Sequence, residues 1–292
     1  MRIEERALSF ACEGCWLYGV LSLPSDSAGS APLTQRGVVV VVGGPQYRVG
    51  SHRQFTLLAR ELAQRGVPVF RFDYRGMGDS EGEMRDFSDI DADLRAAIDT
   101  FVTEAPQVRE VVLWGLCDAA SAALFYAHQD SRVAGLVLAN PWARTEDGAA
   151  RAYLKHYYLS RLLQPGLWKK IVQGRFDYVG ALRSFGGLCA SAIRRKPGPT
   201  GVTEDSPAEA PSLPQRMLRG FGLFQGPTLF ILSGADLTAR EFEDMASDPA
   251  WRKLMGGKRV SRQSLPDADH TFSRPDWRDQ VAHWTADWLR HW

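Results

Sequence analysis

Cysteine, net charge and long apolar runs are all scarce in this chain of 292 residues. Four cysteines at scattered positions do not make a disulfide framework. Lys and Arg number 35 against 34 Asp and Glu, so a net charge of +1 supplies no field that favours nucleic acid. The longest apolar run, Val38–Val42, is far too short to span a bilayer, and the first six residues lack a signal-peptide core. We therefore expect a cytoplasmic protein that is not integral to a membrane.

Short apolar runs alternate with helical patterns between residues 38 and 140. Val38–Val42 is a continuous β-branched run, typical of a strand buried on both faces. This alternation predicts a parallel sheet with crossover helices. A β-hairpin with a glycine turn is expected before it. The predicted strands are 38–42, 67–72, 111–116, 133–138, 228–232 and 260–265, the hairpin is 2–23, and the helices are 52–65, 87–103 and 275–291.

The alternation stops between Trp142 and Phe224. Helical patterns rich in tyrosine and leucine come first, and a stretch too poor in apolar residues to pack well follows them. We therefore expect an α/β core made of residues 1–141 and 225–292. The insertion, residues 142–224, is predicted to be a helical cap that contains a flexible loop at about 194–213.

The segment from Val111 to Ala120 has the layout of a nucleophile elbow, a sharp strand-to-helix turn that lifts one side chain above a parallel sheet. The usual pattern is G-x-S-x-G. Here the sulfur of Cys117 replaces the hydroxyl, and Ala119 fills the second glycine position. Alanine is still small enough for the helix to pack closely behind the turn.

A catalytic acid and a histidine follow the elbow in the order that this layout requires. Asp236 comes after the strand at 228–232, and His270 lies in the loop between the last strand and the closing helix. His270 is expected to take a proton from Cys117, and Asp236 to orient the imidazole. The alternatives to Asp236 are Asp244, on an apparent helix, and Asp267 and Asp269, beside the histidine.

The oxyanion that forms during acyl transfer needs two backbone N–H donors. One is expected from Asp118, directly after the nucleophile, and the other from Gly44, with Gln46 as second choice, since Pro45 has no N–H. The side chain of Asp118 is expected to oppose the ionisation of the neighbouring thiol. The helix N-terminus and an imidazolium favour a thiolate at Cys117, whereas an adjacent carboxylate disfavours it. The sequence leaves this balance open.

These motifs together resemble the α/β-hydrolase superfamily, near its serine aminopeptidase-like branch. More narrowly, the chain resembles the exosortase A system-associated hydrolase 1 family, in which a cysteine elbow is the expected form. That resemblance implies a link to bacterial exopolysaccharide and protein-sorting systems. It does not identify the substrate. The stretches that carry it are 43–54, 73–80, 114–121, 140–146 and 151–158.

Several polar and aromatic residues are candidates for substrate contact. Arg48 and His52 follow the oxyanion loop and either line the cavity or cap the next helix. His156 and Tyr157, with the basic residues near them, either form an aromatic and basic wall or pack the cap onto the core. Trp142, at the start of the insertion, is a further candidate contact.

Two other motifs are expected to have structural roles rather than chemical ones. Cys12 and Cys15 are expected to be hairpin-turn cysteines rather than half of a zinc site, because no second ligand pair is present. The glycine-rich segment 75–80 lacks the lysine of a P-loop and is expected to shape a turn. No metal and no cofactor are expected.

The sequence therefore predicts a hydrolase that acts through a Cys117 thioester on an ester, thioester or amide. The substrate is expected to be a small molecule or an acyl- or glycan-linked compound. Two alternatives stay open at this point. One is an acyltransferase that uses the same triad, and the other is a non-catalytic hydrolase-like binding protein.

Overall fold

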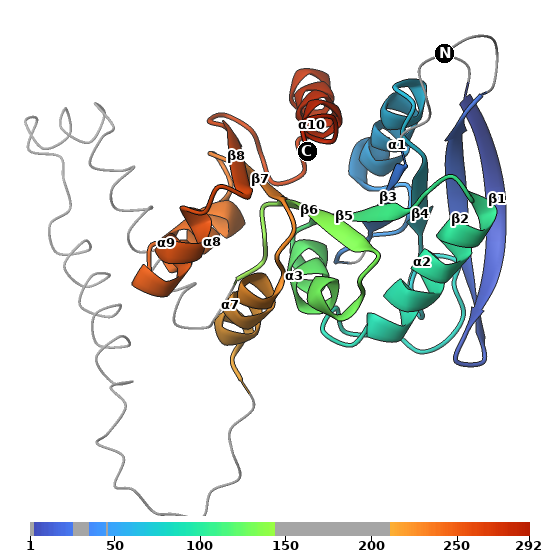
Figure 1. Cartoon of the computed structure of the whole chain (residues 1–292), viewed down its shortest axis with the longest axis horizontal. Helices are drawn as coiled ribbons and strands as arrows, with labels where there is room; N and C mark the ends of the chain where they lie inside the picture. The colour runs from blue at the N-terminus through green and yellow to red at the C-terminus, as the bar shows by residue number, and fades with distance from the viewer. Residues whose placement is uncertain (1–2, 26–34, 45, 144–210) are drawn as a thin grey trace, which may run out of the picture. The chain divides into compact units, whose positions relative to one another are not determined.

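The computed structural model describes residues 3–25, 35–44, 46–143 and 211–292 (Figure 1). The chain divides into two compact units, and apart from Pro211 these residues belong to the first, Met1–Ala149 with Ser212–Trp292. Most of the expected cap, residues 144–210, lies outside the described residues. The fold is therefore described for the first unit by itself.

Eight strands form one sheet in the described residues, in the order β1-β2-β4-β3-β5-β6-β7-β8. β1 and β2 form the expected antiparallel hairpin, which turns at Glu13 and Gly14, both with positive φ. β2 also pairs antiparallel with β4, and every later pair is parallel. The strands are β1 (Ile3–Cys12), β2 (Cys15–Pro24), β3 (Arg36–Val41), β4 (Val69–Phe72), β5 (Glu110–Leu116), β6 (Val133–Ala139), β7 (Thr228–Ser233) and β8 (Val260–Leu265).

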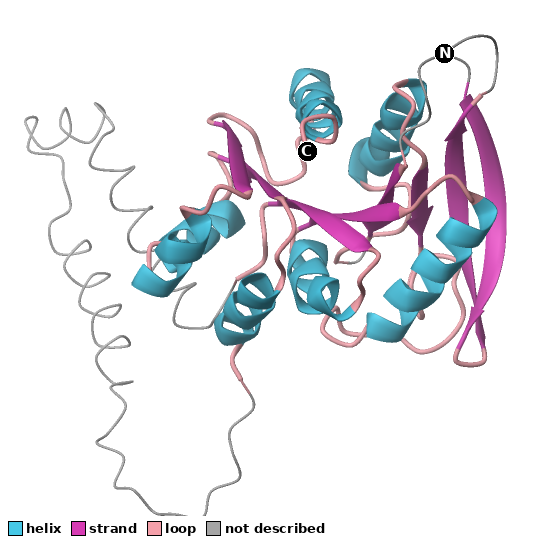
Figure 2. Cartoon of the chain, viewed as in Figure 1, coloured by secondary structure: helices cyan, strands magenta, loops and turns pink. Residues whose placement is uncertain are grey.

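Helices cover both faces of the sheet (Figure 2). α1 (Gln54–Gln64) and α10 (Pro275–Trp288) pack against each other on one face. The other face is covered by α2 (Asp91–Glu104), α3 (Asp118–Tyr126), α7 (Leu213–Leu223), α8 (Leu237–Ala246) and α9 (Pro249–Met255). Short 3-10 turns, η1 (Ser51–Arg53) and η2 (Ala127–Gln129), precede α1 and follow α3. Among the described residues, no helix is both long enough and apolar enough to cross a membrane.

β3 shows why its sequence is continuously apolar. Val38 and Val40 belong to the core under α1 and α10, whereas Val39 and Val41 belong to the core on the opposite face. All four are fully buried. A strand covered on both sides has no position for an alternating polar residue, which confirms the interpretation of the valine run.

The α/β-hydrolase fold with a mostly parallel sheet is confirmed, and three details differ from expectation. α2 begins at Asp91 rather than at residue 87, because Asp86 first forms a turn in which its carboxylate accepts the N–H of Ser88. α9 had no counterpart in the sequence analysis. α7 packs on α3, so residues 213–223, assigned above to the insertion, lie against the core.

Candidate active site

Cys117 lies on a sharp turn between β5 and α3, with φ 65° and ψ −126°. Non-glycine residues rarely adopt this backbone conformation, and it persists only where the surroundings fix it. Here the Cys117 N–H donates to the carbonyl of Ala139 at 2.9 Å. The Cys117 carbonyl accepts from Ala120 at 3.1 Å and from Trp142 at 3.0 Å. The turn is therefore held from both sides at the carboxyl edge of the sheet.

Small residues allow the helix to pass close behind this turn. A Cβ added to Gly115 would lie 2.6 Å from backbone atoms of Ala119 and Ala120. Ala119 itself is fully buried, and its methyl group takes the place of the usual second glycine. The elbow geometry thus needs glycine at 115 but accepts alanine at 119.

Asp236 and His270 reach the same edge from the ends of β7 and β8. Asp236 Oδ2 and His270 Nδ1 are 2.8 Å apart. Asp236 is only 8% exposed, and its carboxylate also accepts the N–H groups of Thr238 and Ala239 at the start of α8. These bonds fix the carboxylate. They assign the hydrogen of the neutral imidazole to Nδ1 and leave Nε2 for Cys117.

The imidazole of His270 has an unusual protonation equilibrium. Burial lowers its pKa, but the hydrogen bonds with Asp236 and Cys117 and the charges of both residues act in the opposite direction and raise the pKa to about 10. The structure therefore brings Cys117, His270 and Asp236 together, in an environment that favours the imidazolium. The carboxylate of Asp269 has other partners, since it accepts the N–H groups of Thr271 and Ser273.

Asn140, the only asparagine in the chain, joins three segments beneath this site. It is fully buried and has a positive φ of 42°. Its Nδ2 donates to Ser233 Oγ and to the His270 carbonyl, both at 2.9 Å, and its Oδ1 accepts the Ser233 N–H at 2.8 Å. The sequence analysis did not single out Asn140. Its signal was a lone polar residue at the end of a buried strand.

Of the two expected oxyanion donors, Gly44 already has a partner for its N–H. Gly44 follows β3 with φ 57°, and its N–H donates to Asp118 Oδ2 at 2.9 Å. The N–H of Ala119 donates to Asp118 Oδ1 at 2.9 Å. Burial raises the pKa of Asp118, while these N–H bonds oppose the increase. Gln46, the second choice of donor, bonds within the loop through its side chain, whose amide oxygen accepts the Ser51 N–H at 3.2 Å.

Arg48 has structural partners in this loop. Its N–H donates to Asp73 Oδ1 at 2.6 Å, and its guanidinium bonds to the carboxylates of Asp73 and Asp79. Because Asp73 is fully buried, Arg48 neutralises a carboxylate within the fold. This arrangement fixes the oxyanion loop to the turn that follows β4.

The remaining substrate-contact candidates fall into two groups. His52 is an exposed residue of η1, with a positive φ of 52°. Trp142 is half-buried, and its carbonyl accepts the Ser121 hydroxyl at 2.6 Å. His156 and Tyr157 lie outside the described residues.

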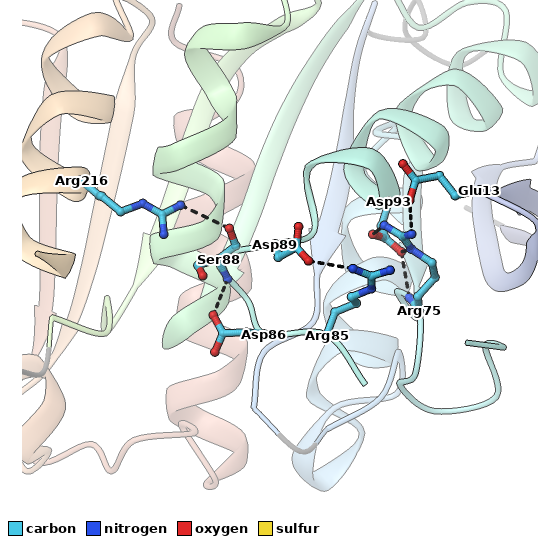
Figure 3. A network of polar contacts seen from close by, with 8 residues as sticks. All are labelled: Glu13, Arg75, Arg85, Asp86, Ser88, Asp89, Asp93 and Arg216. Atoms are coloured by element: carbon cyan, nitrogen blue, oxygen red, sulfur yellow. Dashed lines mark hydrogen bonds and ion pairs between the residues drawn. The ribbon is translucent and has the colours of Figure 1, made fainter. Parts of the chain in front are cut away.

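The glycine-rich turn after β4 is built around a buried ion pair (Figure 3). Arg75 donates from its backbone N–H, Nε and Nη2 to Asp93, and its Nη1 also bonds to Glu13. Gly76 and Gly78 have positive φ, and a Cβ on Gly78 would lie 2.3 Å from a buried carboxylate oxygen of Asp73. The interpretation of this segment as a turn agrees with these contacts.

Cys12 and Cys15 face each other across the hairpin turn and are free thiols. Burial raises the pKa of Cys12 to about 11. In the part of the chain that the structure describes, no three His, Cys, Asp or Glu side chains are grouped so as to hold a metal ion.

The sheet order, the strained turn after β5, the carboxylate after β7 and the histidine after β8 define an α/β-hydrolase fold. The sequence model of the family described as serine aminopeptidase, S33, matches residues 34–176. The fold is similar to that of the Pyrococcus furiosus esterase Pf2001, with a TM-score of 0.64 and 14% identity over 99% of this chain and 93% of the esterase. It is also similar to XC6422 from Xanthomonas campestris, described as an α/β serine hydrolase without lid, with a TM-score of 0.54 and 19% identity over 98% of this chain and 95% of that one.

A curated relative adds a similarity in sequence. The polyketide transferase grgF from a Penicillium species is 32% identical over 117 residues, a match that spans 38% of this chain and 38% of the fungal protein. The similarity to the serine aminopeptidase family spans slightly less than half of the chain, and the shared fold is that of the α/β hydrolases. Cysteine stands at position 117, where the serine enzymes of this fold carry their nucleophile.

Proposed function

We propose that Cys117, His270 and Asp236 form a catalytic triad that cleaves an ester, thioester or amide through a thioester on Cys117. The observation that carries this proposal is the pairing of His270 Nδ1 with Asp236 at 2.8 Å while the same ring bonds to the Cys117 side chain. A nucleophile, a base and a group that orients the base are the parts that covalent acyl transfer needs.

In the acylation step, the Cys117 sulfur attacks the carbonyl carbon of the substrate and His270 holds the thiol proton. A carbon–sulfur bond forms, and the carbonyl π electrons move to oxygen. When this tetrahedral intermediate collapses, the bond to the leaving alcohol, thiol or amine breaks, and His270 delivers the proton to that group. Asp236 stabilises the imidazolium between the two transfers.

In the deacylation step, His270 takes a proton from water as the water oxygen attacks the thioester carbonyl. The carbon–sulfur bond breaks, the carboxylic acid leaves, and the imidazolium returns a proton to the sulfur. The N–H groups of Gly44 and Asp118 are the proposed donors to the oxyanion in both steps, with Gln46 as the alternative to Gly44.

The proposed substrate is a small molecule or an acyl- or glycan-linked compound, and the insertion after β6 is proposed to be a cap. The proposed contacts are Arg48, His52, Trp142, His156 and Tyr157. Arg48 would have to contact the substrate while its guanidinium keeps its ion pairs with two carboxylates. A cytoplasmic role beside a bacterial exosortase or exopolysaccharide system belongs to the same proposal. It is supported by the resemblance of the motifs at 43–54 and 114–121.

Acyl transfer to an acceptor other than water is the second candidate function. The similarity to a protein named a polyketide transferase favours it, since a thioester is readily attacked by alcohols and amines. Mass spectrometry of the products with and without an alcohol or amine acceptor separates the two. A new acyl-acceptor product supports transfer, and the free acid alone supports hydrolysis.

The test of the triad is intact-mass analysis after incubation with p-nitrophenyl esters and acyl thioesters. We expect a single acyl adduct on Cys117 that is absent in Cys117→Ala. Cys15→Ala is the matched control, because Cys15 is the other partly exposed thiol in the described residues and should leave the adduct intact. If Cys117→Ala is acylated as fast as the wild type, the proposal is wrong.

A further inference from the structure

The carboxylate of Asp118 is held by backbone donors from two segments. Gly44, in the loop after β3, donates to Oδ2 at 2.9 Å, and Ala119, in the first turn of α3, donates to Oδ1 at 2.9 Å. The Gly44 N–H is one of the two groups proposed above to bind the oxyanion, and the other is the N–H of Asp118 itself.

The loop after β3 is shaped to accept this carboxylate. A Cβ on Gly43 would lie 2.2 Å from Asp118 Oδ1 and 2.8 Å from the carbonyl of Leu116. Gly44 takes the left-handed conformation that turns its N–H toward the elbow, with φ 57°. Gly43 thus leaves the space that Asp118 fills, and Gly44 supplies the N–H that binds it.

A purely local role for Asp118 explains only part of this arrangement. An acidic residue in the first turn of a helix interacts favourably with the helix dipole, and that accounts for the bond from Ala119. It does not account for the bond from Gly44, which lies 74 residues away in the chain. That bond occupies the Gly44 N–H, which is proposed above to bind the oxyanion of a substrate.

We propose that the Asp118 carboxylate fills the oxyanion hole of the free enzyme and that an acyl substrate must displace it before acylation. This inference rests on the proposed function. The carbonyl oxygen of a substrate competes with Oδ2 for the Gly44 N–H. Acyl donors held by contacts elsewhere on the protein can use that binding to displace the carboxylate. Small esters without such contacts react slowly, so Asp118 is a specificity-determining residue.

The surroundings of Asp118 make the displacement feasible. Its carboxylate is held by uncharged N–H donors, and the like charge of Asp86 repels it. Burial raises the pKa of Tyr74, whose side chain lies after β4, and the charge of Asp118 adds to the increase. A carboxylate with these neighbours loses little electrostatic stabilisation when it moves toward solvent.

The test compares two reactions of Cys117 in the full chain. Acylation by p-nitrophenyl acetate uses the oxyanion hole, whereas alkylation by iodoacetamide does not. Removing the carboxylate changes the charge beside the sulfur and therefore affects both rates. The ratio of the acylation rate to the alkylation rate isolates the oxyanion hole.

Asp118→Ala empties the hole, and we expect its rate ratio to rise about tenfold over the wild type, as for the loss of one competing charged hydrogen bond. Asp118→Asn is the matched variant, since its amide oxygen still accepts from Gly44 without a charge. Its ratio should lie between the other two. Thermal unfolding of each variant verifies that α3 is intact.

The outcomes separate the two proposals. If both rates change in parallel in Asp118→Ala, or if the ratio falls, Asp118 does not block the hole, although Cys117 is still acylated. If no variant is acylated while iodoacetamide still modifies Cys117, the proposed acyl transfer fails, and the block of the hole fails with it.

Discussion

Asp236 and His270 meet at the ends of neighbouring parallel strands, with Oδ2 and Nδ1 2.8 Å apart. The same carboxylate accepts two N–H groups of α8, so its position is set by the helix as well as by the histidine. A carboxylate with three donors cannot rotate freely. It therefore holds the imidazole in one tautomer, with Nε2 directed away from Asp236.

Asp236→Asn should lower kcat toward an activated ester by about 10³-fold or more, because an amide donor at this position favours the wrong tautomer of His270. The variant should remain folded, since the amide oxygen can still accept an N–H of α8. Steady-state kinetics and a thermal melt measure the two effects. Asp267→Asn, an exposed change in the loop of His270, is the control and should retain wild-type kcat. A kcat for Asp236→Asn within tenfold of the wild type would contradict the role of Asp236.

Asn140→Ala should lower the free energy of unfolding by about 2 kcal/mol, because it leaves the buried Ser233 N–H and the His270 carbonyl without this partner. Urea denaturation measures the loss. Ser233→Ala removes the hydroxyl, which accepts from Asn140 and donates to the Asp269 carbonyl, and should cost about 1 kcal/mol. Equal denaturation midpoints for Asn140→Ala and the wild type would show that the bridge between the strand ends contributes nothing.

The raised pKa of His270 predicts a pH-dependent stability. Because the folded protein binds the proton more tightly than the unfolded chain, the stabilisation is fully present below the unfolded value of about 6.5. It is lost as the pH rises through the folded pKa of about 10. The difference in Tm between the wild type and His270→Gln should therefore be largest at or below pH 6.5 and shrink toward pH 10. A difference that stays constant or grows over this range would show that His270 is not preferentially protonated.

Arg75→Met should destabilise the fold by about 3–5 kcal/mol, because it leaves the fully buried Asp93 carboxylate without its counter-charge. Arg85→Met is the matched control in the same network (Figure 3). Its partner Asp89 is 70% exposed, and that pair should contribute less than about 1 kcal/mol. Chemical denaturation compares the two. Similar losses for both variants would contradict the special role of the buried pair.

Much of the fold followed from patterns within single segments. The valine run before Gly43 predicted a strand covered on both faces, and β3 has that environment. The order of Cys117, Asp236 and His270 along predicted strands predicted that they would share one edge of the sheet, and the three side chains meet there. The packing of α7 on α3 did not follow from such patterns, because it involves residues about a hundred positions apart.

The contacts of individual side chains at the site could not be read from the sequence. Asn140 looked like the end of a strand, and it bridges the loop of His270 to β7. Arg48 was expected either to cap a helix or to contact substrate, and its guanidinium bonds to two carboxylates of another turn. Gly44 was expected to present a free N–H, and that N–H donates to Asp118.

By itself, the sequence determined the alternation of strands and helices, the small residues of the elbow and the order of the three reactive side chains. These depend on periodicity and on local backbone geometry, which neighbouring residues encode. Only the tertiary structure decided which donors, carboxylates and carbonyls meet at the edge of the sheet. The reason is that a hydrogen bond between loops depends on positions and directions set by the packing of the whole core, and not on the spacing of its partners along the chain.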